Sequence, residues 1–84
     1  MMAARSLPYP GQLISLKFRS FTFIPDDDAM THDGSWLAGV DEPMLITWVE
    51  YGSCTPGTVH VMHCRGWTGW RLWTDDIAVN TRVL

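Results

Sequence analysis

The chain has 84 residues, of which 46% are hydrophobic, 12% aromatic and 18% charged, and its formal net charge is −3. A chain this short buries one hydrophobic core, which excludes a multidomain enzyme, and its apolar composition excludes an intrinsically disordered protein. No apolar run reaches the roughly 20 residues of a membrane-spanning helix, and residues 1–10 lack the apolar core of a secretory signal. We therefore expect a cytoplasmic protein with a single domain over residues 1–84, in which residues 1–11 form a flexible N-terminal arm.

Charge is strongly segregated along the chain. Residues 1–19 carry three cationic side chains and no acid, and residues 20–64 carry seven acids and neither lysine nor arginine. Residues 65–84 have a net charge of +1. Such segregation produces a local field that influences partner choice and association more than it influences the fold.

The first predicted element is a bent strand over residues 13–24. Apolar and polar residues alternate up to Arg19, and the alternation changes phase after Ser20, so that Phe21 and Phe23 become the apolar set. A one-residue phase change inside a strand is typical of a β-bulge, and bulges bend strands at the corners of small barrels. Pro25 then ends the strand.

Further strands are predicted in the second half of the chain. Residues 25–43 are ambiguous and hold either a short strand or one helical turn. Alternation and β-branched or aromatic residues favour four strands after this segment, and turn-forming residues at 52–57 and 66–69 separate the first three. The predicted strands cover residues 44–51, 58–65, 70–74 and 77–83.

These elements predict an all-β fold with at most one short helical turn. About five strands in so small a chain favour a partly open barrel of the SH3-like or Sm-like kind, with the OB-fold as a competitor. Residues 72–77, together with the last strand that follows them, resemble the ending of SH3-like barrels, in which a short polar turn separates the last two strands. That resemblance covers about a dozen residues and implies fold only.

The expected hairpins place three tryptophans on the surface. A register that pairs Val49 with Met62, and Met62 with Trp73, puts these three side chains on the core face of a three-stranded meander. The same register pairs Thr47 with Cys64 and Arg65 with Trp70. The opposite face then holds Trp48, His63, Arg65 and Trp70, and Trp67 lies at a turn tip. Trp48, Trp67 and Trp70 are therefore candidates for an exposed binding patch, although they could equally cover a small core.

Metal and thiol chemistry is a weaker interpretation. Cys54, His60, His63 and Cys64 include zinc ligand types, but no paired Cys-x-x-Cys motif is present, and His60 and His63 fall on opposite faces of one strand. The acids after Pro25 do not follow the order of an EF-hand calcium loop. We expect no metal, no cofactor, no catalytic residue and no disulfide between Cys54 and Cys64, because the proposed hairpin separates the two sulfurs.

Residues 17–23 favour an alternative function. Cations and aromatic residues interleave there, which is typical of surfaces that bind single-stranded nucleic acid by stacking and phosphate contact. The candidate residues are Lys17, Arg19, Phe21 and Phe23. The chain has only six lysine and arginine residues and an acidic total, which favours instead a core position for the phenylalanines.

The favoured hypothesis is a non-enzymatic module that binds another protein. An acidic loop would meet a basic surface of the partner, and exposed tryptophans would anchor the contact. Small phage-encoded inhibitors of the anti-CRISPR kind occupy nucleic-acid-binding surfaces in this style, which is an analogy without a sequence match. A small metal or thiol protein is the third hypothesis. The candidate partner-binding residues are Asp26, Asp27, Asp28, Asp33, Trp48, Trp67 and Trp70.

Overall fold

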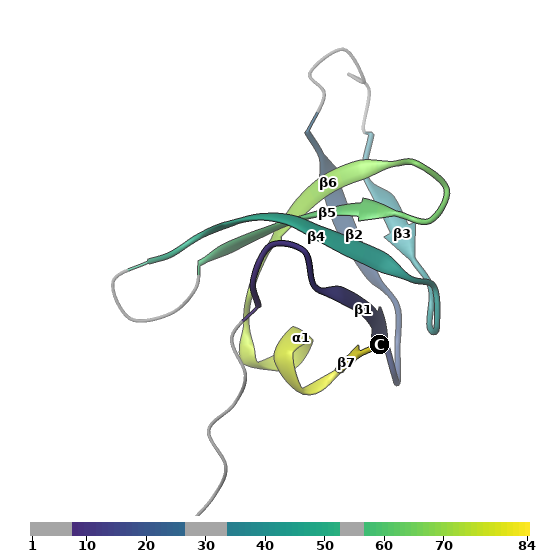
Figure 1. The fold of residues 1–84 in the computed structure, drawn as a ribbon. Helices are drawn as coiled ribbons and strands as arrows, with labels where there is room; N and C mark the ends of the chain where they lie inside the picture. The colour runs from purple at the N-terminus through teal and green to yellow at the C-terminus, as the bar shows by residue number, and fades with distance from the viewer. Residues whose placement is uncertain (1–7, 27–33, 53–56) are drawn as a thin grey trace, which may run out of the picture.

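The dominant feature of the computed structural model is one antiparallel sheet that curls into an open half-barrel (Figure 1). The structure describes residues 8–26, 34–52 and 57–84. Within these ranges it confirms an all-β fold with almost no helix, although the sheet has seven strands where five were expected. The elements are β1 (Leu13–Leu16), β2 (Phe21–Pro25), β3 (Trp36–Ala38), β4 (Met44–Glu50), β5 (Thr58–His63), β6 (Thr68–Leu72), α1 (Asp75–Val79) and β7 (Thr81–Val83).

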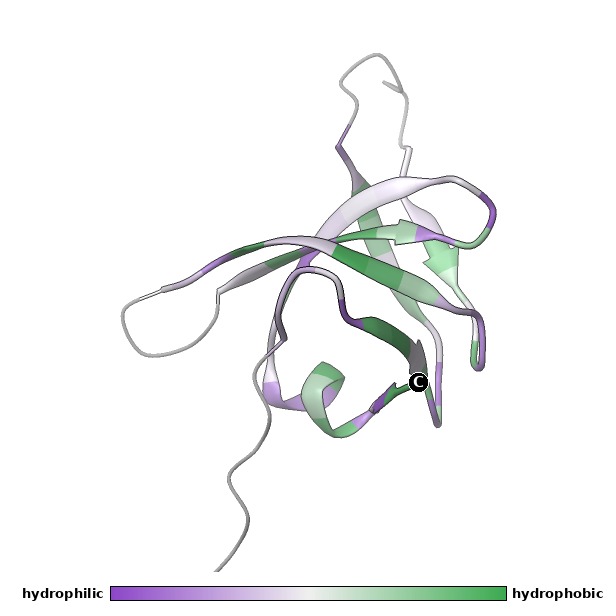
Figure 2. Cartoon of the chain, viewed as in Figure 1, coloured by the Kyte–Doolittle hydropathy of each residue, from purple (hydrophilic) through white to green (hydrophobic). Residues whose placement is uncertain are grey.

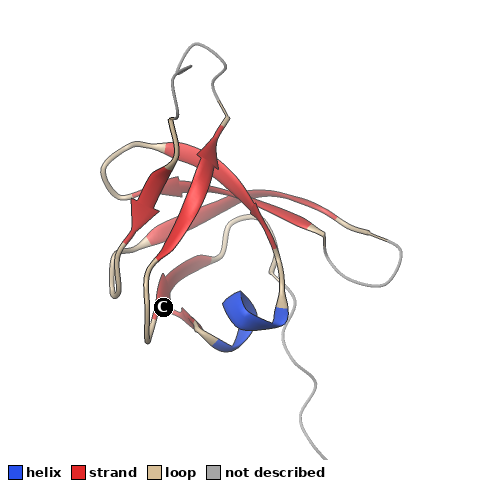
Figure 3. Cartoon of the chain, turned by 180° about the vertical axis from the view of Figure 1, so that it is seen from behind, coloured by secondary structure: helices blue, strands red, loops and turns tan. Residues whose placement is uncertain are grey.

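The strands follow the order β3-β2-β6-β5-β4-β1-β7 across the sheet. The meander β4-β5-β6 is central, and the two N-terminal strands flank it on opposite sides. Leu16 of β1 forms a parallel bridge with Val40, and its carbonyl accepts a hydrogen bond of 2.9 Å from the Asp41 N–H. This contact joins the chain after β3 to β1, so that the curled sheet partly closes on itself (Figure 3).

Alternating apolar side chains build the core on the inner side of the sheet. Figure 2 shows hydrophobic residues along β1, β2 and β4. Within β2 and β4 every second side chain is buried over most of the length, as period-two geometry requires, whereas three consecutive residues of β1 are buried. The buried hydrophobic cluster consists of Ile14, Leu16, Phe21, Phe23, Ala38, Met44, Ile46, Val49, Val59, Val61 and Ile77.

Residues 13–24 form two strands that are not neighbours, which corrects the prediction of one bent strand. The chain turns a corner after Leu16, and β2 then pairs with β3 and β6 while β1 pairs with β4 and β7. Asn80 holds this corner, because its buried side-chain amide accepts a hydrogen bond from the Phe18 N–H (2.5 Å) and donates one to the Arg19 carbonyl (2.7 Å). The phase change at Ser20 marks the corner.

The predicted last strand over 77–83 is wrong at its start. Residues Asp75–Val79 form the short helix α1, and only Thr81–Val83 form a strand. Asp75 and Asp76 occupy the first turn, where the helix dipole favours negative charge. Ile77 is 1% exposed, so one turn of helix is enough to place the apolar residue of this segment in the core.

The predicted hairpin registers are also wrong. Val49 pairs with Val59 rather than with Met62, and β4 contains an irregularity between Ile46 and Trp48. The β5–β6 turn lies at residues 64–66, before the predicted position, because Gly66 adopts a positive φ of 90°. Cross-strand partners are therefore shifted. Three further predicted pairs are absent from these strands: Thr47 with Cys64, Arg65 with Trp70, and Met62 with Trp73.

The register shift changes which side chains are buried. Met62, expected in the core, is 42% exposed, whereas His63, expected outside, is 2% exposed. Trp73 is partly buried against the core. A shift by an odd number of residues moves a strand's side chains to the opposite face, which explains the exchange within β5.

Part of the expected N-terminal arm is packed against the sheet. Pro8 is buried, and the Gly11 N–H donates a hydrogen bond of 2.7 Å to the Ile46 carbonyl. Residues 8–11 therefore do not form a free arm, and residues 1–7 lie outside the described ranges. In the part of the chain that the structure describes, no helix has the length and apolarity needed to cross a membrane.

Candidate functional site

An apolar row crosses the outer face of the four strands β4, β5, β6 and β2. Trp48 lies opposite His60, His60 opposite Trp70, and Trp70 opposite Ile24. Directly paired residues project from the same side of a sheet, so the four side chains share one face. Leu45 and Met62 form a second pair on this side. We define the tryptophan face by Ile24, Leu45, Trp48, His60, Met62 and Trp70.

The side chains of the tryptophan face are substantially exposed. Trp48 is 57% exposed, Ile24 48% and Met62 42%. Trp70 is half-buried between its two neighbouring strands. Single exposed hydrophobic residues are common, but a contiguous exposed apolar patch marks an interaction site or an aggregation hazard.

Two carboxylates border the tryptophan face. Asp26, at the end of β2, lies 3.2 Å from Nδ1 of His60. Glu50 pairs with Thr58 in the row beside Trp48, and its side chain is exposed. Both acids are exposed. Asp27, Asp28 and Asp33, which the sequence placed in the same acidic loop, lie outside the described residues.

Trp67 lies away from the tryptophan face. It follows the β5–β6 turn and stacks on His63, with ring centroids 5.2 Å apart and an interplanar angle of 17°. Trp36 of β3 stacks on Phe23 at 4.8 Å and meets the edge of His63 at 5.2 Å. The three predicted tryptophans therefore belong to two different surfaces.

A groove opens beside this aromatic cluster. Its volume is about 790 Å³, and Trp36, Leu37, Glu42, Arg65 and Trp67 are among its lining residues. The Arg65 guanidinium carbon lies 5.2 Å from the centroid of the Trp67 ring, and Arg65 also pairs with Glu42 at 3.4 Å. The charged groups of the groove are thus already engaged with one another.

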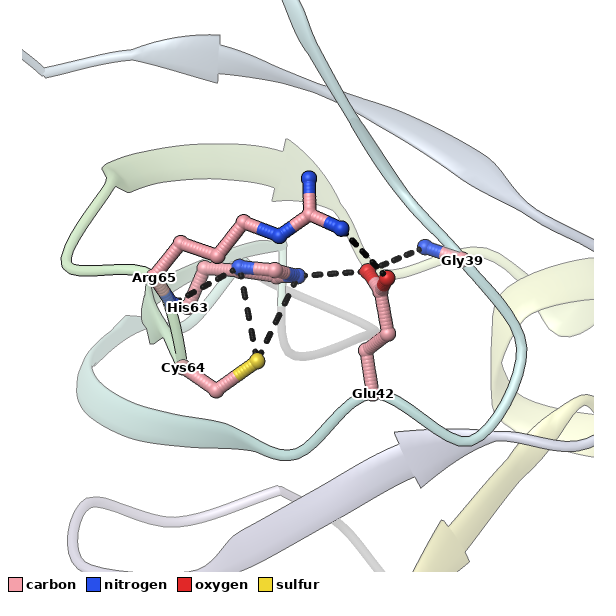
Figure 4. Close-up of polar contacts among 5 residues, drawn as sticks. All are labelled: Gly39, Glu42, His63, Cys64 and Arg65. Carbon is pink, nitrogen blue, oxygen red and sulfur yellow. Dashed lines mark hydrogen bonds and ion pairs between the residues drawn. The ribbon is translucent and has the colours of Figure 1, made fainter.

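Glu42 and His63 form the most tightly connected polar cluster near the groove (Figure 4). Oε1 of Glu42 accepts hydrogen bonds from the Gly39 N–H (2.8 Å) and from Nε2 of His63 (2.7 Å). Nδ1 of His63 accepts the Arg65 N–H at 3.1 Å, so the imidazole proton resides on Nε2. The Gly39 hydrogen bond, followed by that of His63, lowers the pKa of Glu42 below its ordinary value of 4.5.

This cluster does not have the geometry of a thiol nucleophile. Sγ of Cys64 lies 3.7 Å from Nδ1 and 3.9 Å from Nε2 of His63. Because the two distances are nearly equal, the sulfur does not lie along the lone-pair direction of either nitrogen, which proton transfer needs. The lone pair of Nδ1 is also occupied by the Arg65 N–H. The cluster is a structural one.

Of the metal and thiol residues named from the sequence, His63 and Cys64 are in contact, whereas His60 lies elsewhere. His60 is on the outer face beside Asp26, and His63 is buried inside the sheet. Within the described ranges, no group of three or more His, Cys, Asp and Glu side chains could hold a metal ion. Cys54 lies outside these ranges, so the disulfide prediction stays a prediction.

The nucleic-acid candidates are divided between core and surface. Phe21 and Phe23 are 6% and 0% exposed, so their rings cannot stack on bases in the folded protein. Phe18, in contrast, is 74% exposed, with Nζ of Lys17 at 5.2 Å from its ring centroid. The Arg19 guanidinium carbon lies 4.8 Å from the Phe21 ring centroid. The basic strand predicted as a stacking surface is therefore a corner with one exposed aromatic residue.

Sequence reasoning missed Glu42, Trp36 and Arg71 as residues of interest. Glu42 is separated from His63 by 21 positions, and Trp36 from Thr68, whose carbonyl accepts its indole N–H at 3.0 Å, by 32 positions. Only a correct register could have shown that they meet.

Comparison of the chain with protein-family models, with curated proteins and with solved structures finds no match.

Proposed function

We propose that this chain is a non-enzymatic module that binds another protein through its tryptophan face. The observation that carries the proposal is the unbroken row of Trp48, His60, Trp70 and Ile24 across four strands. Tryptophan is among the residues most enriched at the energetic centres of protein interfaces. A rigid sheet presents such anchors with little loss of conformational entropy on binding.

Charge supports a partner with a basic surface. Asp26 and Glu50 flank the tryptophan face, and the whole segment of residues 20–64 contains seven acids without lysine or arginine. A partner with apolar residues at the centre of its site and lysine or arginine at the rim complements this pattern. A second copy of the chain would oppose acid to acid. A nucleic-acid-binding surface is the best match, and occupying it would inhibit that partner.

The fold supports a small scaffold of the SH3-like kind as the finer assignment within the all-β class. The central meander is followed by one short helix and a last strand, β7, that pairs with β1. The connection before the last strand contains the helix α1 instead of the short polar turn expected from residues 72–77. This assignment concerns the scaffold, and the binding proposal rests on the tryptophan face alone.

The test is capture of partners from a lysate by the wild-type protein and two matched variants. Trp48→Ala removes a 57% exposed anchor of the tryptophan face, and Phe18→Ala removes a 74% exposed aromatic residue away from it. We expect Trp48→Ala to lose the captured protein, Phe18→Ala to retain it, and both variants to keep the wild-type melting temperature.

Nuclease treatment separates the alternatives. If the captured material disappears with nuclease, or with Phe18→Ala rather than Trp48→Ala, the corner at residues 17–20 binds nucleic acid and the proposal is wrong. Capture that survives nuclease and depends on Trp48 supports it.

A further inference from the structure

The cleft between β2 and β6 has the features of an anion-binding site. The protein-binding proposal does not use these features. The two strands pair only at Ile24 with Trp70 and at Pro25 with Gly69. Continued in the same register, the ladder would bring Leu72 opposite Thr22, but the strands separate before that point. A pocket of about 310 Å³ lies there, lined by Thr22, Ile24, Trp70, Arg71, Leu72 and Thr74.

Arg71 replaces the missing ladder contact. Its Nη1 donates a hydrogen bond of 2.9 Å to the Thr22 carbonyl, which the continued ladder would have satisfied through a backbone N–H. The guanidinium carbon lies 4.4 Å from the centroid of the Phe21 ring. Nε of Arg71 is buried and has no hydrogen-bond partner among the described residues. A guanidinium carries five N–H donors, and one left buried without an acceptor is costly.

A second cation gathers at the same ring. The Arg19 guanidinium carbon lies 4.8 Å from the Phe21 centroid, so one aromatic side chain serves two positive charges. Burial, and then the charge of Arg19, lower the pKa of Arg71 below its ordinary value. An anion bound here would offset both the burial of the Arg71 guanidinium and its repulsion by Arg19.

Among the described residues, Asp76 supplies counter-charge at this cluster and partly opposes the lowering of the Arg71 pKa. Asp76 approaches Arg19 at 3.5 Å, with side chains that are 76% and 63% exposed respectively. Exposed pairs of this kind contribute little and are readily exchanged for another anion. The cleft therefore has at its wall a guanidinium whose Nε is buried and unpartnered among the described residues. A second cation, Arg19, lies beside it at the Phe21 ring, with partial neutralisation by an exposed carboxylate.

We propose that the cleft between β2 and β6 binds a phosphate group, which Arg71 contacts and Arg19 attracts. Guanidinium groups hold phosphate through paired, charge-assisted hydrogen bonds, and two of them suit a dianion better than a carboxylate. The hydroxyl groups of Thr22 and Thr74 line the same pocket. Trp70 and Leu72 supply an apolar wall, so a phosphate ester of an aromatic compound fits better than inorganic phosphate.

This site does not depend on the protein-binding proposal. Ile24 and Trp70 belong both to the cleft and to the tryptophan face, whereas the two arginines lie outside that face. A bound phosphate ester would compete with a partner protein at this end of the sheet. Phosphate binding is nevertheless measured on the isolated protein, without any partner. A failure of phosphate binding can therefore be distinguished from a failure of partner capture.

The experiment is a titration of the 84-residue chain, followed by two-dimensional NMR of its backbone, indole and Arg71 Nε–H signals. The ligands are sodium phosphate, adenosine 5′-monophosphate and adenosine, with sodium chloride at matched ionic strength to account for screening. We expect adenosine monophosphate to bind more tightly than phosphate, adenosine to bind weakest, and the Arg71 and Trp70 signals to shift.

Four variants make the test specific. Arg71→Met retains the aliphatic length of the side chain and should weaken binding at least about tenfold, and Arg19→Gln should weaken it severalfold. Asp76→Asn should tighten binding severalfold, because it removes the competing carboxylate. Arg82→Gln is the matched control, since it removes an exposed cation from β7 at the far edge of the sheet.

The outcomes decide the proposal even if Arg71→Met fails to fold, because Arg19 and Asp76 are both exposed and their variants should retain the fold. Opposite effects of Arg19→Gln and Asp76→Asn, with no effect of Arg82→Gln, support a phosphate site in the cleft. Equal responses to phosphate and chloride, or equal weakening by Arg19→Gln and Arg82→Gln, would overturn it. Binding of adenosine as tight as that of its monophosphate would also overturn it.

Discussion

Replacement of Glu42 provides the sharpest test of how this fold is held together. Glu42 joins the segment after β3 to β5 and to the β5–β6 turn, through the Gly39 N–H, the His63 imidazole and the Arg65 guanidinium. Glu42→Ala removes all three contacts. Glu42→Gln can keep the two at Oε1, because the amide oxygen is an acceptor, but it loses the negative charge.

The expected loss follows from the burial of each partner. The His63 side chain is fully buried, so its Nε2–H loses an acceptor that water cannot easily replace, at a cost of about 1–3 kcal/mol. The bond to the Gly39 N–H adds about 1 kcal/mol. The Arg65 side chain is 59% exposed, so the loss of that pair adds at most about 1 kcal/mol.

We therefore expect Glu42→Ala to lower the free energy of unfolding by about 2–5 kcal/mol and Glu42→Gln by about 1 kcal/mol. In a domain of this size the melting temperature falls by roughly 4–8 °C per kcal/mol. Urea unfolding at pH 7, followed by tryptophan fluorescence, measures both losses. Glu50→Ala, which removes an exposed carboxylate of β4, is the control and should change stability little.

The same contact predicts a pH dependence with a defined sign. Because folding lowers the pKa of Glu42, chiefly through the Gly39 and then the His63 hydrogen bond, its contribution is complete above the unfolded value of 4.5. It is lost as the pH falls through the lower folded value. The stability difference between wild type and Glu42→Gln should therefore shrink below about pH 4.5. A difference that stays constant or grows there, or a loss below about 0.5 kcal/mol for Glu42→Ala, would refute the reasoning.

Three further predictions concern the corner, the sheet packing and the acidic loop. Asn80→Ala should cost about 2–3 kcal/mol in urea unfolding, since it leaves two backbone groups of the corner unpaired, and a near-neutral result contradicts this role. Gly69→Ala should destabilise the folded protein by about 1–3 kcal/mol and shift its tryptophan fluorescence, because the added Cβ would lie 2.7 Å from both the Ile24 carbonyl oxygen and Nε1 of Trp36. Unchanged stability and emission would disprove the tight contact. Replacing Asp26, Asp27 and Asp28 with asparagine should slow association with the captured partner and flatten its salt dependence at an unchanged or higher melting temperature. Unchanged kinetics across salt concentrations would make the acidic loop a bystander.

Much of the local structure could be predicted from the sequence. The alternation of apolar and polar residues indicated strands around 44–51 and 58–65. The phase change at Ser20 indicated a change of chain direction, although it was interpreted as a bulge within one strand. These features depend on period-two geometry within a few neighbouring residues, so they need no knowledge of what each strand pairs with. The all-β class and the near absence of helix follow from the same pattern.

Only the tertiary structure decided the register and the sites that depend on it. The turn at residues 64–66 and the irregularity in β4 shift the pairing, which buries His63 and exposes Met62. Strand register is set by turn geometry and by the burial of one whole face, both of which are non-local. The Glu42–His63 cluster and the pair of arginines at Phe21 join residues distant in sequence, so alternation along the chain could not reveal them. The helix α1 likewise exists because Ile77 has to reach a core that the other strands have already formed.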